Sequence, residues 1–370
     1  MISRLLKGQI EKVVHTNKAV IVVGPRQVGK TTLIKEILKN NDYLFLDGDD
    51  RSVVAMLAQA DTSLLKRIIG TKKYVFVDEA QKIPNIGNAL KIIVDQLTGV
   101  KLFVSGSSSL QIHESTQESL TGRKFEFELF PISWKEFEGH VGYLEADAQL
   151  EHRLIFGMYP DVINGQDLEL RILKGLSDSY LYQDVLSLTG IRKPDVLEKL
   201  LMALALQVGS EVSFNELAQL LQIDKNTVIK YIDLLERAFI IFTLPSFSRN
   251  LRNEIKNNRK IYFVDNGIRN AIINNFNPIE QRNDLGVLWE NFLVSERRKR
   301  NAYEGHFCRS FFWRTTTQRE IDYLEESGGK IEAREFKWKV GSKVRFPSNF
   351  LSEYHPEIGV IDRSNFRDWI

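Results

Sequence analysis

Residues 19–32, AVIVVGPRQVGKTT, decide the fold of the first part of the chain. The run AVIVV is apolar and rich in β-branched residues, which predicts a buried strand. The loop after it matches the spacing G-x-x-x-x-G-K-[ST], through Gly24, Gly29, Lys30 and Thr31. The amphipathic segment TTLIKEILK then predicts a helix. A glycine-rich loop between a strand and a helix is the setting that a phosphate-binding loop requires.

Such a loop binds phosphates through its backbone, because glycines let N–H groups turn inward and the next helix adds the positive end of its dipole. We expect Lys30 to reach the β- and γ-phosphates of ATP, and the Thr31 hydroxyl to ligate Mg²⁺. The alternative is a decayed loop that no longer binds nucleotide. The residues expected to contact the nucleotide are Gly24, Pro25, Arg26, Gln27, Val28, Gly29, Lys30, Thr31 and Thr32.

A second apolar run, YVFVDEA, ends in an acidic pair. It delivers Asp78 and Glu79 to the carboxyl end of a strand, where ligands bind in open α/β sheets. We expect Asp78 to hold the Mg²⁺ of the nucleotide and Glu79 to polarise the attacking water. The alternative is an acidic turn that only caps the next helix.

Short apolar strands alternate with amphipathic stretches over the first ~130 residues, which predicts an α/β fold with a parallel five-stranded sheet. The phosphate-binding loop follows the first strand and the acidic pair the third. We therefore expect another strand between these two in the sheet, as in AAA-type and related ATPases. The glutamate of the acidic pair and the lack of an N-K-x-D motif favour ATP hydrolysis over a GTP switch. The expected strands are 19–23, 43–47, 74–79, 101–105 and 125–129.

Two further residues are expected to act on the γ-phosphate. Ser105 ends the fourth strand, where a polar side chain can orient the attacking water; the alternative is a turn of small residues. Arg123 directly precedes the fifth strand, and in AAA-type rings an arginine at this place often reaches a neighbour's γ-phosphate. The alternative is a solvated arginine at the strand edge. The first interpretation predicts a homo-oligomer, with a hexameric ring as its candidate form.

The composition is that of a globular protein with several domains. The chain has 370 residues, which at roughly 150 residues per domain predicts two or three of them. Fifty Lys+Arg against 48 Asp+Glu leave a net charge of +2, too little to indicate a nucleic-acid partner by itself. One cysteine, no apolar run near the ~20 residues of a membrane span and no signal-peptide pattern favour a cytoplasmic protein without a membrane partner.

Several segments together resemble the prokaryotic AAA-type ATPases that carry a C-terminal domain of unknown function. They are GPRQVGKTT, VFVDEAQKIP, VSGSSS, SLTGRKFEFELFPISWKEF and GMYPDVI, followed by KIYFVDNGIRNAI and LWENFLVSERRK. The resemblance spans nearly the whole chain and implies an ATPase core, a winged helix and a nuclease-like end. The expected domains are a P-loop AAA-type core over 1–132, a helical lid over 133–208, a winged helix over 209–275 and a small α/β nuclease-like domain over 276–370.

Residues 211–272 predict two short helices and a hairpin. Ser213 and Glu216 have capping-box spacing at the first helix, and DKNTVIKYIDLLERAF predicts the second. The pair resembles a helix-turn-helix, whose second helix enters the major groove of DNA. The alternative is a packing or protein-docking module, which acidic residues on the second helix favour. The residues expected to contact DNA lie on this helix and on a basic wing: Lys225, Asn226, Thr227, Lys230, Arg249, Arg252, Lys256, Arg259 and Lys260.

The C-terminal segments WRTTTQREIDYLEE and KIEAREFKWK contain a D…E-x-K pattern. A hairpin would place Asp322 on one strand, and Glu335 and Lys337 on one face of the next, because residues two apart in a strand point the same way. Glu290, on the preceding helix, could join them. The pattern resembles the PD-(D/E)xK nuclease core, in which two carboxylates hold Mg²⁺ against a scissile phosphate. The alternative is an ion-pair cluster on a nuclease-like fold that does not cleave.

Together the patterns predict an AAA-type ATPase that couples Mg-ATP hydrolysis to conformational work on DNA, as a motor or remodeller. Two alternatives stay open. The first is an ATP-driven switch that gates a protein partner, and the second is an ATP-gated, metal-dependent DNA nuclease. The six histidines show no paired metal-ligand spacing, so no structural zinc site is expected.

Overall fold

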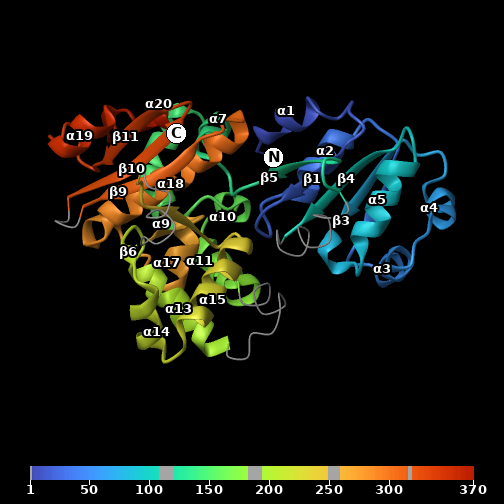
Figure 1. Ribbon diagram of the computed structural model, residues 1–370, viewed down its shortest axis with the longest axis horizontal. Helices are drawn as coiled ribbons and strands as arrows, with labels where there is room; N and C mark the ends of the chain where they lie inside the picture. The colour runs from blue at the N-terminus through green and yellow to red at the C-terminus, as the bar shows by residue number, and fades with distance from the viewer. Residues whose placement is uncertain (1, 108–119, 182–193, 249–258, 316–318) are drawn as a thin grey trace. The chain divides into compact units, whose positions relative to one another are not determined.

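The computed structural model describes residues 2–107, 120–181, 194–248, 259–315 and 319–370 (Figure 1). The chain divides into two compact units, each with its own core. The first unit contains the described residues up to Pro131 together with Arg237–Phe239, and the second contains the remaining described residues. Among the described residues, no helix combines the length and apolar character that a membrane crossing needs.

The first unit is built on a five-stranded parallel sheet in the order β2-β3-β4-β1-β5. Because β4 lies between β1 and β3, the predicted insertion of a strand between the two functional strands is confirmed. The β1 strand is buried over its whole length, as its AVIVV sequence predicts. The strands are β1 (Ala19–Val23), β2 (Tyr43–Asp47), β3 (Tyr74–Asp78), β4 (Lys101–Gly106) and β5 (Lys124–Glu128).

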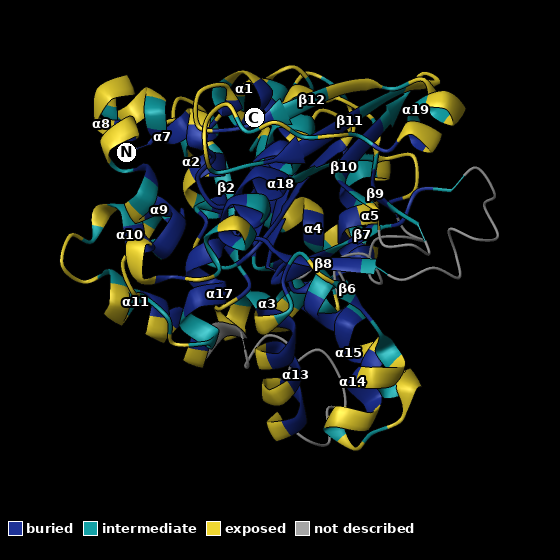
Figure 2. Ribbon diagram, turned by 90° about the vertical axis from the view of Figure 1, so that its left-hand side faces the viewer, coloured by how far each residue is buried: buried dark blue, intermediate teal, exposed yellow. Residues whose placement is uncertain are grey.

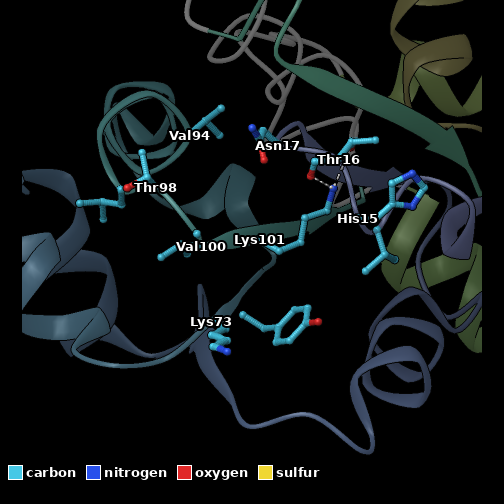
Figure 3. Close-up of a pocket in the computed structure, with 12 residues that line it drawn as sticks. His15, Thr16, Asn17, Lys73, Val94, Thr98, Val100 and Lys101 are labelled. Atoms are coloured by element: carbon cyan, nitrogen blue, oxygen red, sulfur yellow. Dashed lines mark hydrogen bonds between the residues drawn. The ribbon is translucent and has the colours of Figure 1, made fainter.

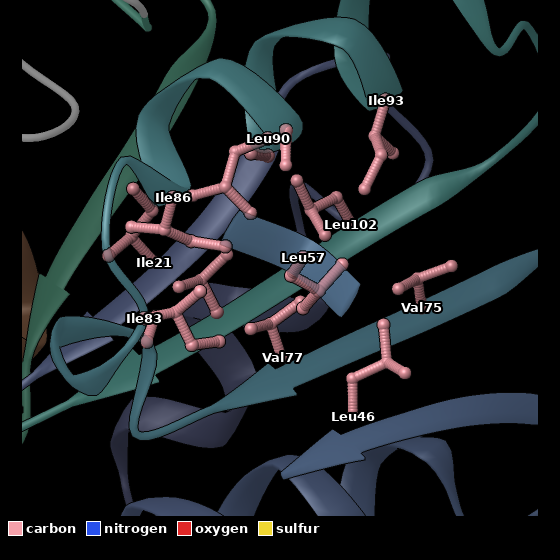
Figure 4. Close-up of a cluster of buried hydrophobic side chains, with 14 of the residues drawn as sticks. Ile21, Leu46, Leu57, Val75, Val77, Ile83, Ile86, Leu90, Ile93 and Leu102 are labelled. Carbon is pink, nitrogen blue, oxygen red and sulfur yellow. The ribbon is translucent and has the colours of Figure 1, made fainter. Parts of the chain in front are cut away.

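Helices cover this sheet and close its core. Figure 4 shows Leu57, Ile86 and Ile93 from the helices next to Val75, Val77 and Leu102 from the strands. The Asp50 and Asp61 carboxylates cap two of the helices by accepting hydrogen bonds from backbone N–H groups. The helices are α1 (Leu6–Glu11), α2 (Lys30–Leu38), α3 (Arg51–Ala58), α4 (Thr62–Ile69) and α5 (Ile86–Gln96), with a 3₁₀ turn η1 (Ala80–Lys82).

The second unit begins with helices, as predicted for residues 133–208. Ser133 and Glu136 form a complete capping box that starts the first of them. Asn270 Nδ2 donates a hydrogen bond of 2.7 Å to the Ile155 carbonyl, which fastens α17 (Asn266–Ile272) to α9. The helices of this part are α7 (Trp134–Val141), α8 (Tyr143–Ala148), α9 (Leu150–Phe156), α10 (Pro160–Asn164) and α11 (Glu169–Gly175), with a π-helical turn η2 (Leu176–Leu181).

Three helices and a three-stranded antiparallel sheet follow. The last two helices and the pair β7–β8 match the two helices and the hairpin predicted for residues 211–272, whereas β6 was not predicted. The Ser213 hydroxyl accepts a hydrogen bond from Glu216 N, and Asp224 caps the next helix through Thr227 N. The sheet order is β6-β8-β7. The elements are α13 (Pro194–Leu206), β6 (Glu211–Val212), α14 (Phe214–Leu221), α15 (Lys225–Arg237), β7 (Ile241–Pro245) and β8 (Arg259–Phe263).

The last part of the second unit is a long helix and a mixed four-stranded sheet. Its order is β12-β11-β10-β9, with β12 parallel to β11 and the other pairs antiparallel. The hairpin that contains Asp322 and the strand that contains Glu335 were predicted from the sequence, whereas β12 was not. Figure 2 shows α18 largely dark blue, since Trp289 and Phe292 are buried in an aromatic cluster with Phe366. The elements are η3 (Ile279–Gln281), α18 (Leu285–Glu304), β9 (Arg309–Arg314), β10 (Glu320–Ser327), β11 (Lys330–Phe336), α19 (Ser348–Tyr354), β12 (Glu357–Ile361) and α20 (Phe366–Trp369).

Candidate nucleotide site

The glycine-rich loop leaves the sheet at the carboxyl end of β1. Val23, the last residue of β1, lies beside Gly106 of β4 and Glu128 of β5. At Gly24 the loop passes so close to the neighbouring segment that an added Cβ would lie 2.1 Å from the Leu129 carbonyl oxygen. Gly24 also has a positive φ of 151°, so only glycine fits this exit from the strand.

The other end of the loop enters α2 at Lys30. Gln27 and Gly29 adopt left-handed conformations, with φ of 59° and 93°. Lys30 is only 5% exposed, and its Nζ donates to the carbonyl oxygens of Gly24 at 2.9 Å and Pro25 at 2.6 Å. The amine is therefore folded into the loop, in the place where the predicted phosphate contacts would form.

Three side chains meet at the carboxyl ends of β3 and β4 and the start of α2. Thr31 Oγ1 donates a hydrogen bond of 2.8 Å to Asp78 Oδ2, and the Ser105 hydroxyl donates to the other oxygen, Asp78 Oδ1. Asp78 and Ser105 are buried. A hydroxyl and a carboxylate beside a phosphate-binding loop are hard oxygen donors of the kind Mg²⁺ prefers, so Thr31 and Asp78 fit the predicted role of holding the ion. Ser105 orients Asp78, a contact that the sequence did not predict.

Glu79 follows in a strained conformation, with φ of 47° in the left-handed region. Gln81 Nε2 donates to Glu79 Oε2 at 2.6 Å and to Ser107 Oγ at 3.0 Å, which fixes the direction of the Glu79 carboxylate. Gln81 Oε1 is buried and has no hydrogen-bond partner among the described residues. Sequence reasoning missed Gln81 and Ser107, although both lie in the quoted segments VFVDEAQKIP and VSGSSS.

Arg123 lies at the amino ends of the strands, whereas the loop lies at their carboxyl ends. Its carbonyl oxygen accepts a hydrogen bond from Ala19 N at the start of β1. Its Nε donates to Asp95 Oδ1 of α5 at 2.6 Å, and its side chain is 44% exposed. The arginine therefore lies away from its own phosphate-binding loop, as expected. Its action on a neighbouring subunit stays a prediction.

Family comparisons agree with this geometry. Residues 16–138 match the model of an AAA domain. A Walker-type ATPase of Pyrococcus abyssi, PABY2304, aligns in structure over 74% of this chain and 96% of its own, with a TM-score of 0.50 and 16% identity. The first unit has the fold of the AAA-type P-loop ATPases. We refer to it below as the ATPase unit.

The other matching family models and the matching curated relatives carry no assigned function. Residues 147–278 and 285–365 match two domains of unknown function, DUF8612 and DUF4143. The uncharacterised protein MJ1544 of Methanocaldococcus jannaschii is 25% identical over 87% of this chain and 75% of its own length. The uncharacterised protein Rv2008c of Mycobacterium tuberculosis is 26% identical over 89% and 72%. The boundaries of the four predicted domains stay predictions; the structure separates two units.

The ATPase unit has a separate pocket of about 300 Å³ at the amino ends of its strands (Figure 3). Lys101, the first residue of β4, lies in its wall and is 8% exposed. Its Nζ donates to the carbonyl oxygens of Val13 at 2.9 Å, Thr16 at 2.9 Å and Lys18 at 2.6 Å. Burial lowers the pKa of Lys101 to about 8. The ammonium thus ties the segment before β1 to β4.

The lowered pKa of Lys101 makes the free energy of unfolding depend on pH. Between pH 8 and the ordinary lysine pKa near 10.5, the unfolded chain binds a proton at this site that the folded chain has lost. The free energy of unfolding of the wild type, relative to Lys101→Met, should therefore rise with pH across this interval, by at most about 1.4 kcal/mol per pH unit. Denaturant unfolding at pH 7, 8, 9 and 10 measures it, with exposed Lys73→Met from the same pocket as the control. A pH-independent difference contradicts the prediction.

Eight of the nine predicted DNA-contact residues divide into three groups. Lys225, Asn226 and Lys230 are exposed on α15, whereas Thr227 donates its hydroxyl to Asp224 in the helix cap. Arg259 is half-buried at the start of β8. Arg249, Arg252 and Lys256 lie outside the described residues.

For Lys260 the structure contradicts the prediction of a DNA contact. This lysine of β8 is 1% exposed, and its Nζ lies 3.0 Å from Glu290 Oε1 and 2.5 Å from Glu320 Oε1. Burial disfavours the ammonium, but Glu290, Glu320 and Asp322 hold the pKa of Lys260 above its usual range. The basic run in the sequence suggested solvent exposure, whereas this residue points into a cluster of carboxylates and cannot reach a phosphate backbone.

Lys260→Met should lower the free energy of unfolding of the second unit by about 3–5 kcal/mol, because it leaves buried carboxylates without their cation. Denaturant unfolding followed by tryptophan fluorescence measures the loss. Lys330→Met, at an exposed lysine that begins β11, serves as the matched control. A change as small as that of the control means that Glu290 and Glu320 are solvated without Lys260.

The predicted C-terminal residues do come together, with Asp322 between Lys260 on one side and Glu335 and Lys337 on the other. Lys337 Nζ lies 2.9 Å from Glu335 Oε2 and 3.6 Å from Asp322 Oδ2. Glu290 joins at the other side through Lys260 and through Tyr262, whose hydroxyl donates to Glu290 Oε1 at 2.7 Å. Burial and the nearby Asp322 carboxylate raise the pKa of Glu335 to about 7. The arrangement is a cluster of carboxylates and lysines that spans α18, β8, β10 and β11.

A separate set of possible metal ligands consists of His306, Cys308 and Glu325. Their ligand atoms lie within 4.8 Å of one another. Its carboxylate is already engaged, since Arg297 donates two hydrogen bonds to Glu325 at 2.9 and 2.5 Å. Burial and Glu325 raise the pKa of the Cys308 thiol to about 11, which opposes the thiolate that a metal needs. We therefore assign no metal to this group.

Proposed function

We propose that this protein hydrolyses ATP with Mg²⁺ and uses the turnover for conformational work on DNA. The observation that carries the ATPase part is the meeting of Lys30, Thr31, Asp78 and Glu79 around one loop. Lys30 would bind the β- and γ-phosphates in place of its present carbonyl acceptors, and Thr31 and Asp78 would hold the ion. Bound Mg²⁺ neutralises charge that develops on the phosphates. Glu79, directed by Gln81, would accept the proton of the attacking water.

The DNA part rests on α15 and the elements around it. Three helices followed by a β-hairpin are the element order of a winged helix. The third of these helices, α15, corresponds to the recognition helix, and the exposed Lys225, Asn226 and Lys230 lie on its N-terminal part. The experiment is ATP turnover with and without single-stranded, duplex and branched DNA. Stimulation that falls with salt, and that is lost in the variant carrying Lys225→Ala and Lys230→Ala, supports the proposal. Turnover that no DNA changes favours the alternative, an ATP-driven switch that gates a protein partner.

A second candidate function is an ATP-gated nuclease, and the grouping of Asp322, Glu335 and Lys337 favours it. The two carboxylates lie on adjacent strands, and hard oxygen donors of this kind can hold Mg²⁺ beside a phosphate while a lysine stabilises charge. Cleavage of DNA that needs Mg²⁺ or Mn²⁺ and disappears in Asp322→Ala supports this function. A protein that binds DNA and turns over ATP without cutting leaves the cluster as an ion-pair network.

The active form is proposed to be a homo-oligomer in which Arg123 acts on a neighbour's γ-phosphate. Its exposure and its place away from its own loop support the idea. Arg123→Ala and Lys30→Ala proteins, each inactive alone, should recover part of the activity when mixed, because some interfaces then join an intact loop to an intact arginine. Co-assembled mixtures without recovery would reduce Arg123 to its ion pair with Asp95.

A further inference from the structure

Arg4 lies ahead of α1 and before the segment that matches an AAA domain, which begins at residue 16. It is 8% exposed. The residues around it anchor this stretch, because Ile2, Leu6 and Ile10 are buried in the core of the ATPase unit. The segment from Ile2 to Ile10 is thus packed against the unit and places the Arg4 guanidinium in its interior.

The guanidinium bridges two backbone carbonyls that are far apart in sequence. Its Nη1 donates to the Val28 oxygen at 2.6 Å, and its Nη2 donates to the Phe130 oxygen at 2.5 Å. Val28 belongs to the phosphate-binding loop, and Phe130 follows β5. Hydrogen bonds from a charged donor are stronger than those between neutral groups, so both carbonyls are held firmly.

The contact with Val28 fixes the direction of the next amide. In a trans peptide the C=O of one residue and the N–H of the next point opposite ways. Because the Val28 oxygen is turned toward Arg4, the Gly29 N–H is turned away from it. A Cβ added at Gly29 would lie 3.9 Å from Arg4 Nη1, which places the guanidinium against this stretch of the loop. Loop N–H groups that point inward are what bind phosphate oxygens.

The contact with Phe130 connects the end of the loop to the segment that follows β5. At the start of the loop, Leu129 N donates to the Val23 oxygen at 2.8 Å, and Gly24 passes directly against the Leu129 carbonyl. At its end, Arg4 joins Val28 to Phe130. The two ends of the loop are therefore anchored to two consecutive residues after β5, Leu129 and Phe130.

We propose that Arg4 is a positioning residue that holds the phosphate-binding loop in its nucleotide-binding shape. The proposal rests on the ATPase function proposed above. Arg4 acts through the Val28 and Phe130 carbonyls and does not itself touch the nucleotide. Its loss should weaken nucleotide binding, because the loop must then be ordered at the moment of binding. The chemical step depends on Asp78 and Glu79 and should change little.

The test is steady-state ATP turnover of the full-length Arg4→Met protein, with Mg²⁺ present. KM should rise about ten- to hundredfold, the loss expected for hydrogen bonds from a charged group, while kcat stays within about threefold. The matched control is Lys7→Met. Lys7 joins α1 to α2 through an ion pair with Glu36 at 2.7 Å, on a part of α2 beyond the loop. Arg4→Lys keeps the charge and should return KM toward the wild-type value.

A KM for Arg4→Met within twofold of the Lys7→Met value overturns the proposal, and so does an equal fall in kcat. If Arg4→Met does not fold, Arg4→Gln keeps a neutral amide donor on a shorter side chain, and is judged against the same control. Wild-type protein that neither binds nor hydrolyses ATP contradicts the ATPase function itself. Wild-type protein that turns over ATP beside an unaffected Arg4 variant contradicts only the role of Arg4.

Discussion

Glu79→Gln is expected to stop ATP turnover while ATP binding stays intact. The amide keeps the shape of the side chain and can still accept a hydrogen bond from Gln81, but it cannot take a proton from water. General-base catalysis contributes typically about 10²–10⁴ in rate, so kcat should fall by that factor. The Kd for ATP should stay within about threefold, since Glu79 does not hold the phosphates. Turnover assays and calorimetric titration of ATP measure the two quantities separately.

A carboxylate elsewhere in the ATPase unit provides the control for Glu79. Glu36→Gln, on α2, removes a half-exposed ion pair with Lys7 at 2.7 Å, which lies outside the nucleotide site. Its turnover should equal that of the wild type. A Glu79→Gln protein that hydrolyses ATP as fast as Glu36→Gln would assign the base to another group. A Glu79→Gln protein that no longer binds ATP would instead give Glu79 a role in holding the loop.

The nucleotide site could be predicted because its residues follow strands of one parallel sheet. The carboxyl ends of β1, β3 and β4 meet at one edge, so Lys30, Asp78 and Ser105 had to lie near each other once the strands were recognised. The strand order also followed from the motifs, since β4 lies between the loop strand and the acidic strand. What the sequence could not supply was the partner of Ser105, which depends on the side-chain directions of two adjacent strands.

Arg4 and Lys260 show where sequence reasoning stops. Arg4 contacts a carbonyl 126 positions away, and no local pattern marks that pairing. Lys260 lies in a basic run, which suggested a solvated wing, yet β8 is the central strand of its sheet and turns this side chain toward Glu290 and Glu320. In both cases the cationic side chain binds acceptor oxygens inside the protein. Composition and spacing cannot distinguish this use of a basic residue from binding to an external phosphate.

Lys30→Ala is expected to remove ATP binding. The Lys30 amine is buried in the loop and already donates to two carbonyl oxygens, so it is placed to exchange these acceptors for phosphate oxygens. Each hydrogen bond to a charged group contributes about 1.5–3 kcal/mol, and Lys30 is expected to make two of them. The Kd for ATP should therefore rise about 10²–10⁴-fold, which calorimetric titration with Mg²⁺ present can measure.

The control for Lys30→Ala lies at the other end of the same helix. Lys39, just after the last residue of α2, is exposed, and Lys39→Ala keeps the loop intact while it removes the same charge. Thermal unfolding without nucleotide shows whether Lys30→Ala still folds, because the substitution also removes the contacts with Gly24 and Pro25. In the folded variant, ATP should no longer raise the melting temperature, whereas Lys39→Ala should respond like the wild type. Equal stabilisation of the two variants by ATP would place the triphosphate outside this loop, and the buried lysine would then be a structural brace alone.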